Sequence, residues 1–429
     1  MDISELYKIY RDHPDVSTDS RNIRHGCLFF ALKGDTFNGN LFVGEALGKG
    51  ASWAIADKKE CAPGPRIIVV DDVLQTLQQL ASFHRQQCRF SILAITGSNG
   101  KTTTKELCSS VLGRQYRLYA TRGNLNNHIG VPLTLLSMPP DTEIGIIEMG
   151  ANHPGEITLL GDIAMPDHGL ITNIGKAHLE GFGSIEGVAK AKGELFTYLA
   201  AHNGTFFANA GNDLIRRMIP PEKKNMVLYN SRDTLWAEET DSGLFLELVI
   251  HDEADIIPVR SRLVGQYNAE NLLAAYAVGK HFGIPPSLIS AAIEQYIPDN
   301  NRSQFIKTAS NEIIMDAYNA NPSSMKAAIE NFMTRQRDNS IIILGEMLEL
   351  GKSSLREHES IIGNLKKYTG QKVICIGRGF ESPAKSAGYP WYPDVSSLLS
   401  VLTHSPIKAS FILIKGSRGN KLEKLVEVL

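Results

Sequence analysis

The amino-acid sequence predicts an α/β protein of about three domains, with a parallel sheet in the central one. The chain has 429 residues, more than one ordinary hydrophobic core accommodates. Hydrophobic residues make up 43% of the chain and charged residues 21%, which is typical of a soluble globular protein. Short apolar runs alternate with segments of helical composition, and this alternation predicts parallel strands covered by helices on both faces.

Residues 1–88 form the first predicted unit. Strands are expected at 28–32, 53–56 and 66–70, and helices near 41–49 and 71–87. Polar clusters at 17–21 and 33–40 lie before and after the first strand. On local grounds alone these clusters are ordinary loops.

The second unit, 89–303, begins with the most informative stretch of the chain. An apolar run at 92–96 predicts a buried strand, and 101–112 have the composition of a helix. Between them lies Gly97-Ser98-Asn99-Gly100-Lys101-Thr102-Thr103. Free backbone N–H groups at a helix N-terminus attract phosphate oxygens, and glycines let the backbone approach them closely. The stretch therefore predicts an ATP site.

Two side chains of this loop are candidates for direct roles. Lys101 is expected to place its charge on the β- and γ-phosphates, and Thr102 to offer its hydroxyl to Mg²⁺. The loop is shorter than the full phosphate-loop pattern, which requires a glycine where this chain has Ile95. The alternative is a glycine-rich turn between strand and helix with a solvated lysine.

Further strands of this unit are expected within 144–150, 169–174 and 204–209. Ligands collect beyond the carboxyl ends of parallel strands, so Glu148 and Asn173 should converge on the nucleotide. Mg²⁺ takes oxygen ligands, which makes Glu148 a candidate, although a solvated glutamate fits the local sequence equally well. His178 taken alone is better explained as a surface or capping residue. Asn268 and Asn271 share a face at the start of a helix, and capping would explain one of them.

The last unit, 304–429, follows a turn-rich boundary at 298–302. Strands are expected near 312–316, 340–345, 372–376 and 410–415, and helices near 323–335, 355–367, 394–402 and 420–428. Loops at 316–322, 344–351 and 415–420 follow three of these strands. All three should emerge at one edge of the sheet, as a binding surface that faces the ATP unit requires.

Charge and cysteine content exclude several classes of protein. The net charge of -2 gives no indication of nucleic-acid binding. Five widely spaced cysteines, at 27, 61, 88, 108 and 375, argue against a disulfide framework or a zinc ribbon and fit a reducing compartment. Residues 1–5 lack the features of a signal peptide, and no apolar run approaches ~20 residues. A cytoplasmic protein without a membrane span is expected.

Together, several stretches resemble the ATP-dependent Mur ligases of peptidoglycan synthesis. The resemblance covers nearly the whole chain, and its motifs lie at 19–21, 29–34, 96–103, 123–127, 148–150, 177–180, 191–194, 316–322, 345–351 and 415–418. The loop, Glu148 and His178 are common to Mur ligases and folylpolyglutamate synthases. The last three motifs are characteristic of the member that adds D-alanyl-D-alanine, and Asp-Asn-Pro-Arg, which marks the ligase adding the third residue, does not occur.

The resemblance implies three domains: 1–88 for the UDP-sugar, a central ATPase at 89–303, and a Rossmann-like domain at 304–429 for the incoming amine. It implies a ligase that uses ATP and Mg²⁺ to join D-alanyl-D-alanine to UDP-N-acetylmuramoyl-tripeptide through an acyl phosphate. A monomer is expected. The alternatives are another Mur-type or folylpolyglutamate-type amide ligase, or a non-catalytic ATP-binding regulator. The N-terminal unit before the loop weighs against a folylpolyglutamate synthase, and the retained Lys101, Glu148 and His178 weigh against a regulator.

The resemblance also implies roles for single residues. Thr102 and Glu148 would hold the Mg²⁺ bound to ATP, and His178 a second Mg²⁺. Lys192 matches a lysine that relatives carry as a carbamate, which would also be a metal ligand; the alternative is an ammonium paired with Glu194 or with phosphate. ATP contacts are implied for Gly97, Ser98, Asn99, Gly100, Lys101, Thr102, Thr103, Asn271, Arg302 and Asp316, and substrate contacts for Ser20, Arg21, Lys33, Asn126, Asn127, Asn319 and Asn321.

Overall fold

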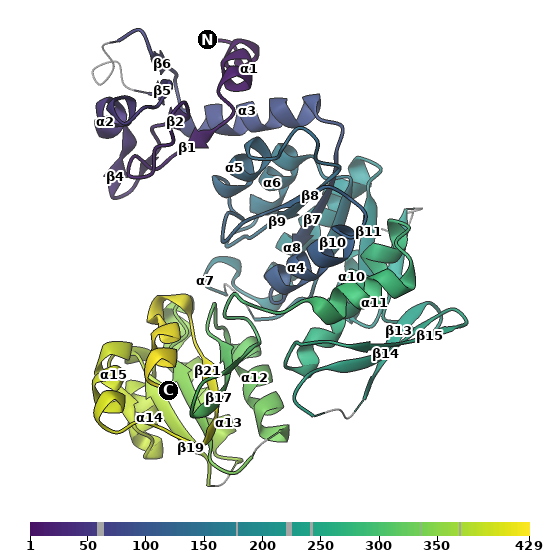
Figure 1. Ribbon diagram of the computed structural model, residues 1–429, viewed down its shortest axis with the longest axis vertical. Coiled ribbons are helices and arrows are strands. Elements are labelled where there is room, and N and C mark those ends of the chain that lie inside the picture. The colour runs from purple at the N-terminus through teal and green to yellow at the C-terminus, as the bar shows by residue number, and fades with distance from the viewer. Residues whose placement is uncertain (58–63, 177–178, 220–224, 241–242, 336, 369) are drawn as a thin grey trace.

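The computed structural model describes residues 1–429 except 58–63, 177–178, 220–224, 241–242, 336 and 369. It confirms the predicted α/β class, with three units that follow one another along the molecule in chain order (Figure 1). Each unit contains a largely parallel sheet flanked by helices, and a small antiparallel sheet is attached to the central unit. Within the described residues, no helix is both long and apolar enough to cross a lipid bilayer.

The first unit has a parallel sheet of order β1-β2-β5-β6, with strands Val16–Ser17, Leu28–Phe30, Trp53–Ala56 and Ile67–Val69. A short hairpin pairs β3 (Lys33–Gly34) with β4 (Phe37–Asn38). The helices are α1 (Ile3–Asp12), the 3-10 helix η1 (Gly39–Phe42), α2 (Val43–Gly48) and α3 (Val73–Gln87). The predicted strands are therefore present, two of them with shorter ends. Helix α3 begins after Asp72, whose carboxylate accepts the N–H of Gln75.

The central sheet is parallel throughout and has the order β12-β11-β10-β7-β9-β8. Its strands are β7 (Ser91–Thr96), β8 (Leu118–Ala120), β9 (Ile144–Glu148), β10 (His168–Ile171), β11 (Thr205–Asn209) and β12 (Met226–Tyr229). In β7, Ile92 and Ala94 enter the core on one face of the sheet, whereas Leu93 and Ile95 enter the core on the other. Helices cover both faces, which is why the strand is apolar without interruption.

The helices of this unit are α4 (Lys101–Leu112), α5 (Gly130–Leu136), α6 (Glu156–Ala164), α7 (Leu179–Phe182), α8 (Ile185–Ala201), α9 (Asp213–Met218), η3 (Gln266–Asn268), α10 (Ala269–His281) and α11 (Pro286–Gln295).

A three-stranded antiparallel sheet, β13 (Leu235–Thr240), β14 (Glu247–Asp252) and β15 (Asp255–Arg260), was not predicted. Alternation in β14 is the signal for it, since Leu248 and Ile250 are buried on one face.

The third sheet has the order β16-β17-β21-β18-β19-β20, and only the β16–β17 pair is antiparallel. The strands are Gln304–Lys307, Asn311–Asp316, Ser410–Lys415, Ser340–Gly345, Lys372–Ile376 and Trp391–Tyr392, in that order. The helices are α12 (Pro322–Thr334), η4 (Gly351–Ser353), α13 (Ser354–Leu365), η5 (Arg378–Phe380), α14 (Glu381–Ala387) and α15 (Val395–His404).

The predicted α-helix at 420–428 is wrong. The segment instead forms two 3-10 helices, η6 (Arg418–Asn420) and η7 (Leu422–Val428). Leu422 and Leu425 are both fully buried and lie three residues apart. That spacing places both side chains on the same side of a helix with three residues per turn, so burial of the two leucines favours the tighter form.

Candidate functional site

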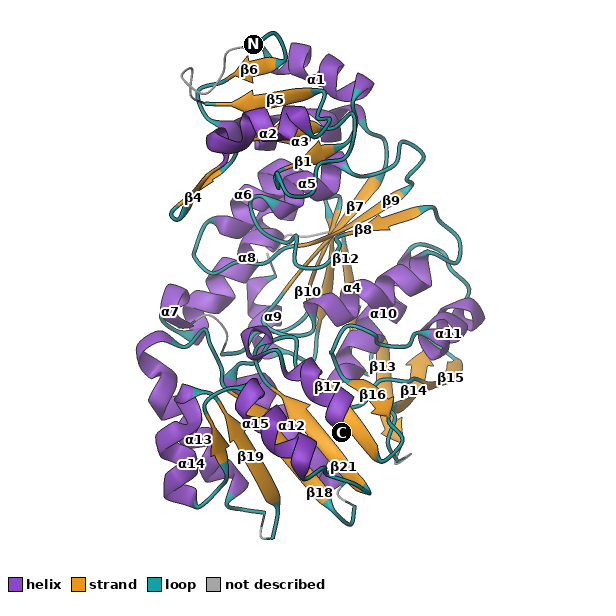
Figure 2. Ribbon diagram, turned by 60° about the vertical axis from the view of Figure 1, so that its left-hand side comes forward, coloured by secondary structure: helices purple, strands orange, loops and turns teal. Residues whose placement is uncertain are grey.

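A cavity of about 1010 Å³ lies where the central and third units meet. Its lining comes from loops that follow β7, β9 and β10 on one side and β17, β18 and β21 on the other. Figure 2 shows the third sheet below the central one, with the connecting loops of both between them. The strand ends on which the sequence placed its candidates therefore surround one space, as expected for a ligand site in parallel-sheet units.

The loop at 97–103 contains two glycines whose backbone φ angles favour glycine over other residues. Gly97 has φ 144° and Gly100 has φ 76°, both in the region that favours glycine. A Cβ on Gly97 would lie 2.0 Å from the Thr172 hydroxyl oxygen, and one on Gly100 would lie 2.4 Å from Oδ1 of Asn271. Helix α4 begins directly after Gly100. The absent Cβ atoms therefore let Thr172 and Asn271 pack directly against the loop, and the loop leads into the backbone N–H groups at the start of α4.

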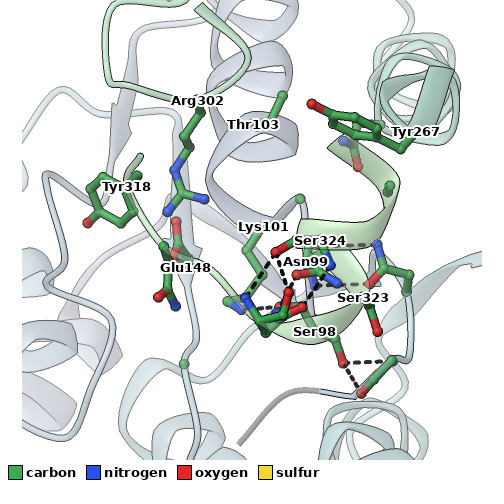
Figure 3. A pocket seen from close by; sticks show the side chains of 18 of the residues that line it. Ser98, Asn99, Lys101, Thr103, Glu148, Tyr267, Arg302, Tyr318, Ser323 and Ser324 are labelled. Carbon is green, nitrogen blue, oxygen red and sulfur yellow. Dashed lines mark hydrogen bonds between the residues drawn. The ribbon is translucent and has the colours of Figure 1, made fainter. Parts of the chain in front are cut away.

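Lys101 extends back over this loop. Its Nζ donates hydrogen bonds to the carbonyl oxygens of Gly97 at 2.7 Å and Ser98 at 3.3 Å. Burial lowers the pKa of Lys101, the Glu148 carboxylate opposes that shift, and the positive charge of Arg302 adds to it. The ammonium therefore lies in the cavity, close to both groups (Figure 3).

Asn173, predicted to face the nucleotide from a strand end, makes hydrogen bonds that fix the shape of the phosphate loop. Its Oδ1 accepts the backbone N–H of Asn99 at 2.9 Å, and its Nδ2 donates to the Asn99 carbonyl at 3.1 Å. The Thr172 hydroxyl donates to the same carbonyl at 2.6 Å. These bonds hold the middle of the loop against the end of β10, so the loop is preorganised without a ligand.

Glu148 ends strand β9 and is 2% exposed. Its Oε2 accepts the Thr102 hydroxyl at 2.7 Å, and its Oε1 accepts Nδ2 of Asn126 at 2.8 Å. A carboxylate and a hydroxyl thus lie side by side next to the phosphate loop, and oxygen donors of this kind suit Mg²⁺. Asn127, by contrast, uses its Oδ1 to accept the N–H groups of Ile129 and Gly130 at 3.1 and 2.9 Å, near the start of α5.

Lys192 is fully buried on helix α8. Its Nζ donates to the carbonyl of Ala151 at 3.2 Å and lies 5.3 Å from the centre of the Phe182 ring. Burial, reinforced by the charge of Lys101, lowers the pKa of Lys192 to about 7. The Glu194 carboxylate accepts the backbone N–H groups of Gly155 at 2.7 Å and Thr158 at 3.0 Å, at the start of α6. His178 lies outside the described residues.

Asn271 lies in the first turn of α10, against the phosphate loop. Its Oδ1 accepts the Thr104 hydroxyl at 3.1 Å, and its Nδ2 donates to Oδ1 of Asn268 at 2.9 Å. Asn268 in turn donates to the Ser303 hydroxyl at 3.1 Å, which also bonds to the Tyr267 hydroxyl at 2.9 Å. The sequence interpretation gave Ser303 no role. A polar residue at this position did not indicate the role, because the bonds of Ser303 to Asn268 and Tyr267 join residues far apart in the chain.

The three predicted loops of the third unit do meet at one edge. Lys415, 1% exposed, forms an ion pair with Asp316 at 2.9 Å and donates to the Asn319 carbonyl at 3.0 Å. Leu348 donates its N–H to the Ser417 hydroxyl at 3.1 Å. All five residues line the cavity. Lys415 thus joins the loop after β17 to the loop after β21.

One side chain bridges the two units at the phosphate loop. Nδ2 of Asn321 donates to Oδ1 of Asn99 at 2.7 Å, while Oδ1 of Asn321 accepts the N–H of Ser324 and starts helix α12. A second bridge joins the N–H of Lys176 to the Ser323 hydroxyl at 3.2 Å. The loop that is predicted to hold phosphate is therefore in direct contact with the third unit.

The three candidates in the first unit lie away from this cavity and are not part of its lining. Arg21 pairs with Asp19 at 2.8 Å, Lys33 pairs with Asp57 at 2.6 Å, and the carbonyl of Ser20 accepts Nζ of Lys49 at 2.9 Å. They belong to the first unit, which Figure 1 places at the opposite end of the molecule from the third unit. The structure thus brings the ATP candidates together but leaves this group on its own.

Three family models match consecutive parts of the chain. Residues 15–85 match "Mur ligase family, catalytic domain", 95–279 match "Mur ligase middle domain", and 301–418 match "Mur ligase, glutamate ligase domain". The three matches follow the order of the three sheets.

Several relatives that match over nearly their full length are named UDP-N-acetylmuramoyl-tripeptide--D-alanyl-D-alanine ligase. The Bacillus subtilis protein is 36% identical over 96% of this chain and 92% of its own length, and the Escherichia coli protein is 33% identical over 96% and 93%. A crystal structure of MurF from Acinetobacter baumannii superposes with a TM-score of 0.87, at 29% identity over 99% of this chain and 97% of that one. MurF from Thermotoga maritima in complex with ADP gives a TM-score of 0.84, at 26% identity over 96% of both chains.

Proposed function

Because this chain belongs to the Mur ligase family, we propose that it joins D-alanyl-D-alanine to UDP-N-acetylmuramoyl-tripeptide and converts ATP to ADP and phosphate. The product is UDP-N-acetylmuramoyl-pentapeptide, a precursor of peptidoglycan. The observation that carries the proposal is the shared cavity, in which the phosphate loop at 97–103 faces the loops of the third unit. An enzyme that passes an activated acid to an amine needs both sites in one space.

In the first step, the terminal carboxylate of the tripeptide attacks the γ-phosphorus of ATP. A bond forms between the carboxylate oxygen and phosphorus, the bond to the β-phosphate oxygen breaks, and ADP leaves. Two anions must approach each other, so Lys101 and the N–H groups at the start of α4 serve by neutralising charge on the triphosphate. The result is an acyl phosphate.

In the second step, the amine of D-alanyl-D-alanine attacks the acyl carbon, phosphate leaves and the amine loses a proton. Water competes for the same carbon, so the site must exclude it. The contact between Asn321 and Asn99 supports a closure in which the third unit covers the phosphate loop. Asn319, beside it on the same loop, is proposed to contact the incoming amine substrate.

Residues that would hold Mg²⁺ are present. The Thr102 hydroxyl and the Glu148 carboxylate fit this ion because both are oxygen donors beside the loop, and His178 is proposed for a second ion. When bound, Mg²⁺ supplies positive charge to the phosphate oxygens. Asn126 holds the Glu148 carboxylate in orientation through its amide.

We assign the three units the roles of UDP-sugar binding (1–88), ATP binding (89–303) and amine binding (304–429). The group around Ser20, Arg21 and Lys33 would then contact the UDP end of a long substrate, which explains its separation from the cavity. The described cysteines, Cys27, Cys88, Cys108 and Cys375, are free thiols, which fits an enzyme of the reducing cytoplasm. We propose that the enzyme is a monomer.

The test is a phosphate-release assay with purified protein. We expect release only when ATP, UDP-N-acetylmuramoyl-tripeptide and D-alanyl-D-alanine are all present. Lys101→Ala should lower turnover at least ~10²-fold, the effect of removing one preorganised charge-stabilising group. Release with a folate and glutamate, or no release with any acceptor, would overturn the proposal.

We also propose that Lys192 carries a carbamate. The neutral amine attacks CO₂, a C–N bond forms and one proton leaves, which turns a cation into an oxygen ligand. A pKa of about 7 makes the neutral amine abundant at neutral pH, unlike that of an ordinary lysine near 10.4. Native mass spectra in bicarbonate should show the mass of one added CO₂, and a low concentration of acetate or formate should restore activity to Lys192→Ala. Lys190→Ala, an exposed neighbour on the same helix, is the matched control, and unimpaired Lys192→Ala activity would contradict the proposal.

A further inference from the structure

Tyr318 lies between two arginines at the junction of the central and third units. The guanidinium carbon of Arg302 lies 3.9 Å from the centre of its ring, and that of Arg418 lies 5.1 Å from it. Nη1 of Arg418 also donates to the Tyr318 hydroxyl at 3.4 Å. All three side chains line the cavity, and Figure 3 shows Arg302 beside the ring of Tyr318. One aromatic ring therefore contacts two cations that come from different segments of the chain.

The backbone on both sides of Arg302 is strained. Asn301 has φ 57° and Ser303 has φ 48°, in the left-handed region that residues with a Cβ rarely adopt. The carbonyl of Asn301 accepts the N–H groups of Ala317 at 2.9 Å and Tyr318 at 3.2 Å. These bonds attach the linker, the turn-rich segment 298–303 between the two units, to the loop that carries Tyr318. The strain is thus maintained by contacts on both sides of the junction, which is typical of a functional position rather than of a passive linker.

Arg302 itself has unused bonding capacity. Its Nε is buried and has no hydrogen-bond partner among the described residues. Lys101 lines the same cavity as Arg302 and Arg418. Two guanidinium groups and an ammonium in one cavity repel one another, and a bound polyphosphate would relieve that repulsion. The face of the Tyr318 ring attracts the Arg302 guanidinium but carries no net negative charge. The positive charge of Arg302 can therefore still interact with an anionic ligand.

We propose that Tyr318 is a positioning residue that holds Arg302 and Arg418 for the triphosphate of ATP. The inference rests on the proposed function, because it takes the anion in this cavity to be ATP. The ring belongs to the third unit and Arg302 to the linker, so correct placement of Arg302 requires the third unit to be docked. Tyr318 thereby makes nucleotide affinity depend on the position of the third unit.

The experiment measures the affinity for β,γ-methylene-ATP with Mg²⁺ by calorimetry, in the absence of both acceptor substrates. Tyr318→Leu removes the ring, and Tyr318→Phe keeps the ring but removes the hydroxyl. We expect Tyr318→Leu to weaken binding by about 3- to 30-fold, the range for a cation on an aromatic face, and Tyr318→Phe to stay within about twofold of the wild type. Arg302→Ala should weaken binding in the wild type but have a much smaller effect when added to Tyr318→Leu.

Equal affinity of the Leu and Phe variants, or additive effects of the Leu and Arg302→Ala changes, would overturn the role of Tyr318. Thermal melting without ligand checks that the variants fold, and Tyr318→Met replaces Tyr318→Leu if the latter does not. A wild-type protein that bound no nucleotide at all would instead overturn the proposed function. The two failures are therefore distinguishable.

Discussion

Glu148 is a buried carboxylate directly beside the loop that is proposed to hold phosphate. Its two oxygens accept hydrogen bonds from Thr102 and Asn126, which keep it oriented but do not cancel its charge. A negative charge at this place repels phosphate unless a cation lies between them. We therefore propose Glu148 as a metal ligand rather than as a purely structural residue of the cavity lining.

Glu148→Gln tests this interpretation with little change in shape. The amide can still bond to Thr102, but it cannot supply the charge that holds a divalent cation. We expect turnover to fall by about 10²- to 10³-fold, as for loss of one preorganised charge-stabilising group, and thermal stability to stay close to that of the wild type. Glu143→Gln, just before the opposite end of the same strand, is the control and should retain normal turnover. Turnover of Glu148→Gln within a few-fold of the wild type would contradict the assignment.

For single residues, the sequence was most informative where the residue type and the backbone conformation that it permits point to the same role. Gly97 and Gly100 were predictable because only glycine permits their φ angles and close contacts. The Lys415–Asp316 pair and the Asn321–Asn99 bridge were not predictable, because each joins loops from distant parts of the chain. Their residues were found through family resemblance, and their contacts only through the fold.

Helix α3 is the element that ties the first unit to the central one. Near its end lies Arg85, a residue 8% exposed, whose side chain reaches the end of helix α6. Its Nε donates to the Ala164 carbonyl at 3.1 Å, and its Nη2 donates to the Met165 carbonyl at 3.1 Å and to the Asp167 carboxylate at 2.9 Å. One side chain thus satisfies carbonyl groups at the helix end that have no intrahelical partner.

Arg85→Ala should therefore destabilise the protein through loss of these bonds. We expect the free energy of unfolding to fall by about 2–3 kcal/mol, since buried acceptors lose a charged donor. Urea unfolding followed by circular dichroism measures the change. Arg89→Ala, an exposed arginine just after the helix, should change stability by less than about 0.5 kcal/mol. Equal effects of the two substitutions would show that the contacts of Arg85 contribute no stability.

Elements were predictable where an apolar run is long and both faces are buried. Strand β7 was identified almost to its ends for this reason. The β13–β15 sheet was missed because one face of it is exposed, as Ile256 at 67% exposure illustrates, so its strands are less apolar. The 3-10 form of η7 was missed because Leu422 and Leu425 are also compatible with an α-helix, and only packing distinguishes the two.

Two partly buried histidines are expected to make the stability of the whole molecule depend on pH. Burial lowers the pKa of His84, on α3, to about 4, and burial with the nearby His281 lowers that of His168, on β10, to about 4. Between pH 4 and the unfolded value near 6.5, the unfolded chain binds more protons than the folded one, so stability rises with pH. We expect stability to fall steadily as pH drops from 6.5 to 4.

Urea midpoints across this pH range test the expectation. His84→Gln and His168→Gln remove the titrating group and should each flatten the dependence, whatever their effect on stability at pH 7. His404→Gln, at an exposed position on α15, should leave the slope unchanged. A slope that persists in the double variant His84→Gln/His168→Gln would assign the pH dependence to other groups.

Asn321 makes one of several contacts between the central and third units, and its two functions can be tested separately. Its Nδ2 reaches Asn99 in the central unit, and its Oδ1 caps α12 within the third. Serine also caps helices but is too short to reach Asn99, whereas alanine does neither. We expect Asn321→Ser to increase the radius of gyration measured by X-ray scattering without ligand while leaving the melting temperature nearly unchanged. Asn321→Ala should open the molecule equally and also lower stability by about 1 kcal/mol. A scattering curve of Asn321→Ser identical to that of the wild type would show that other contacts keep the third unit over the loop.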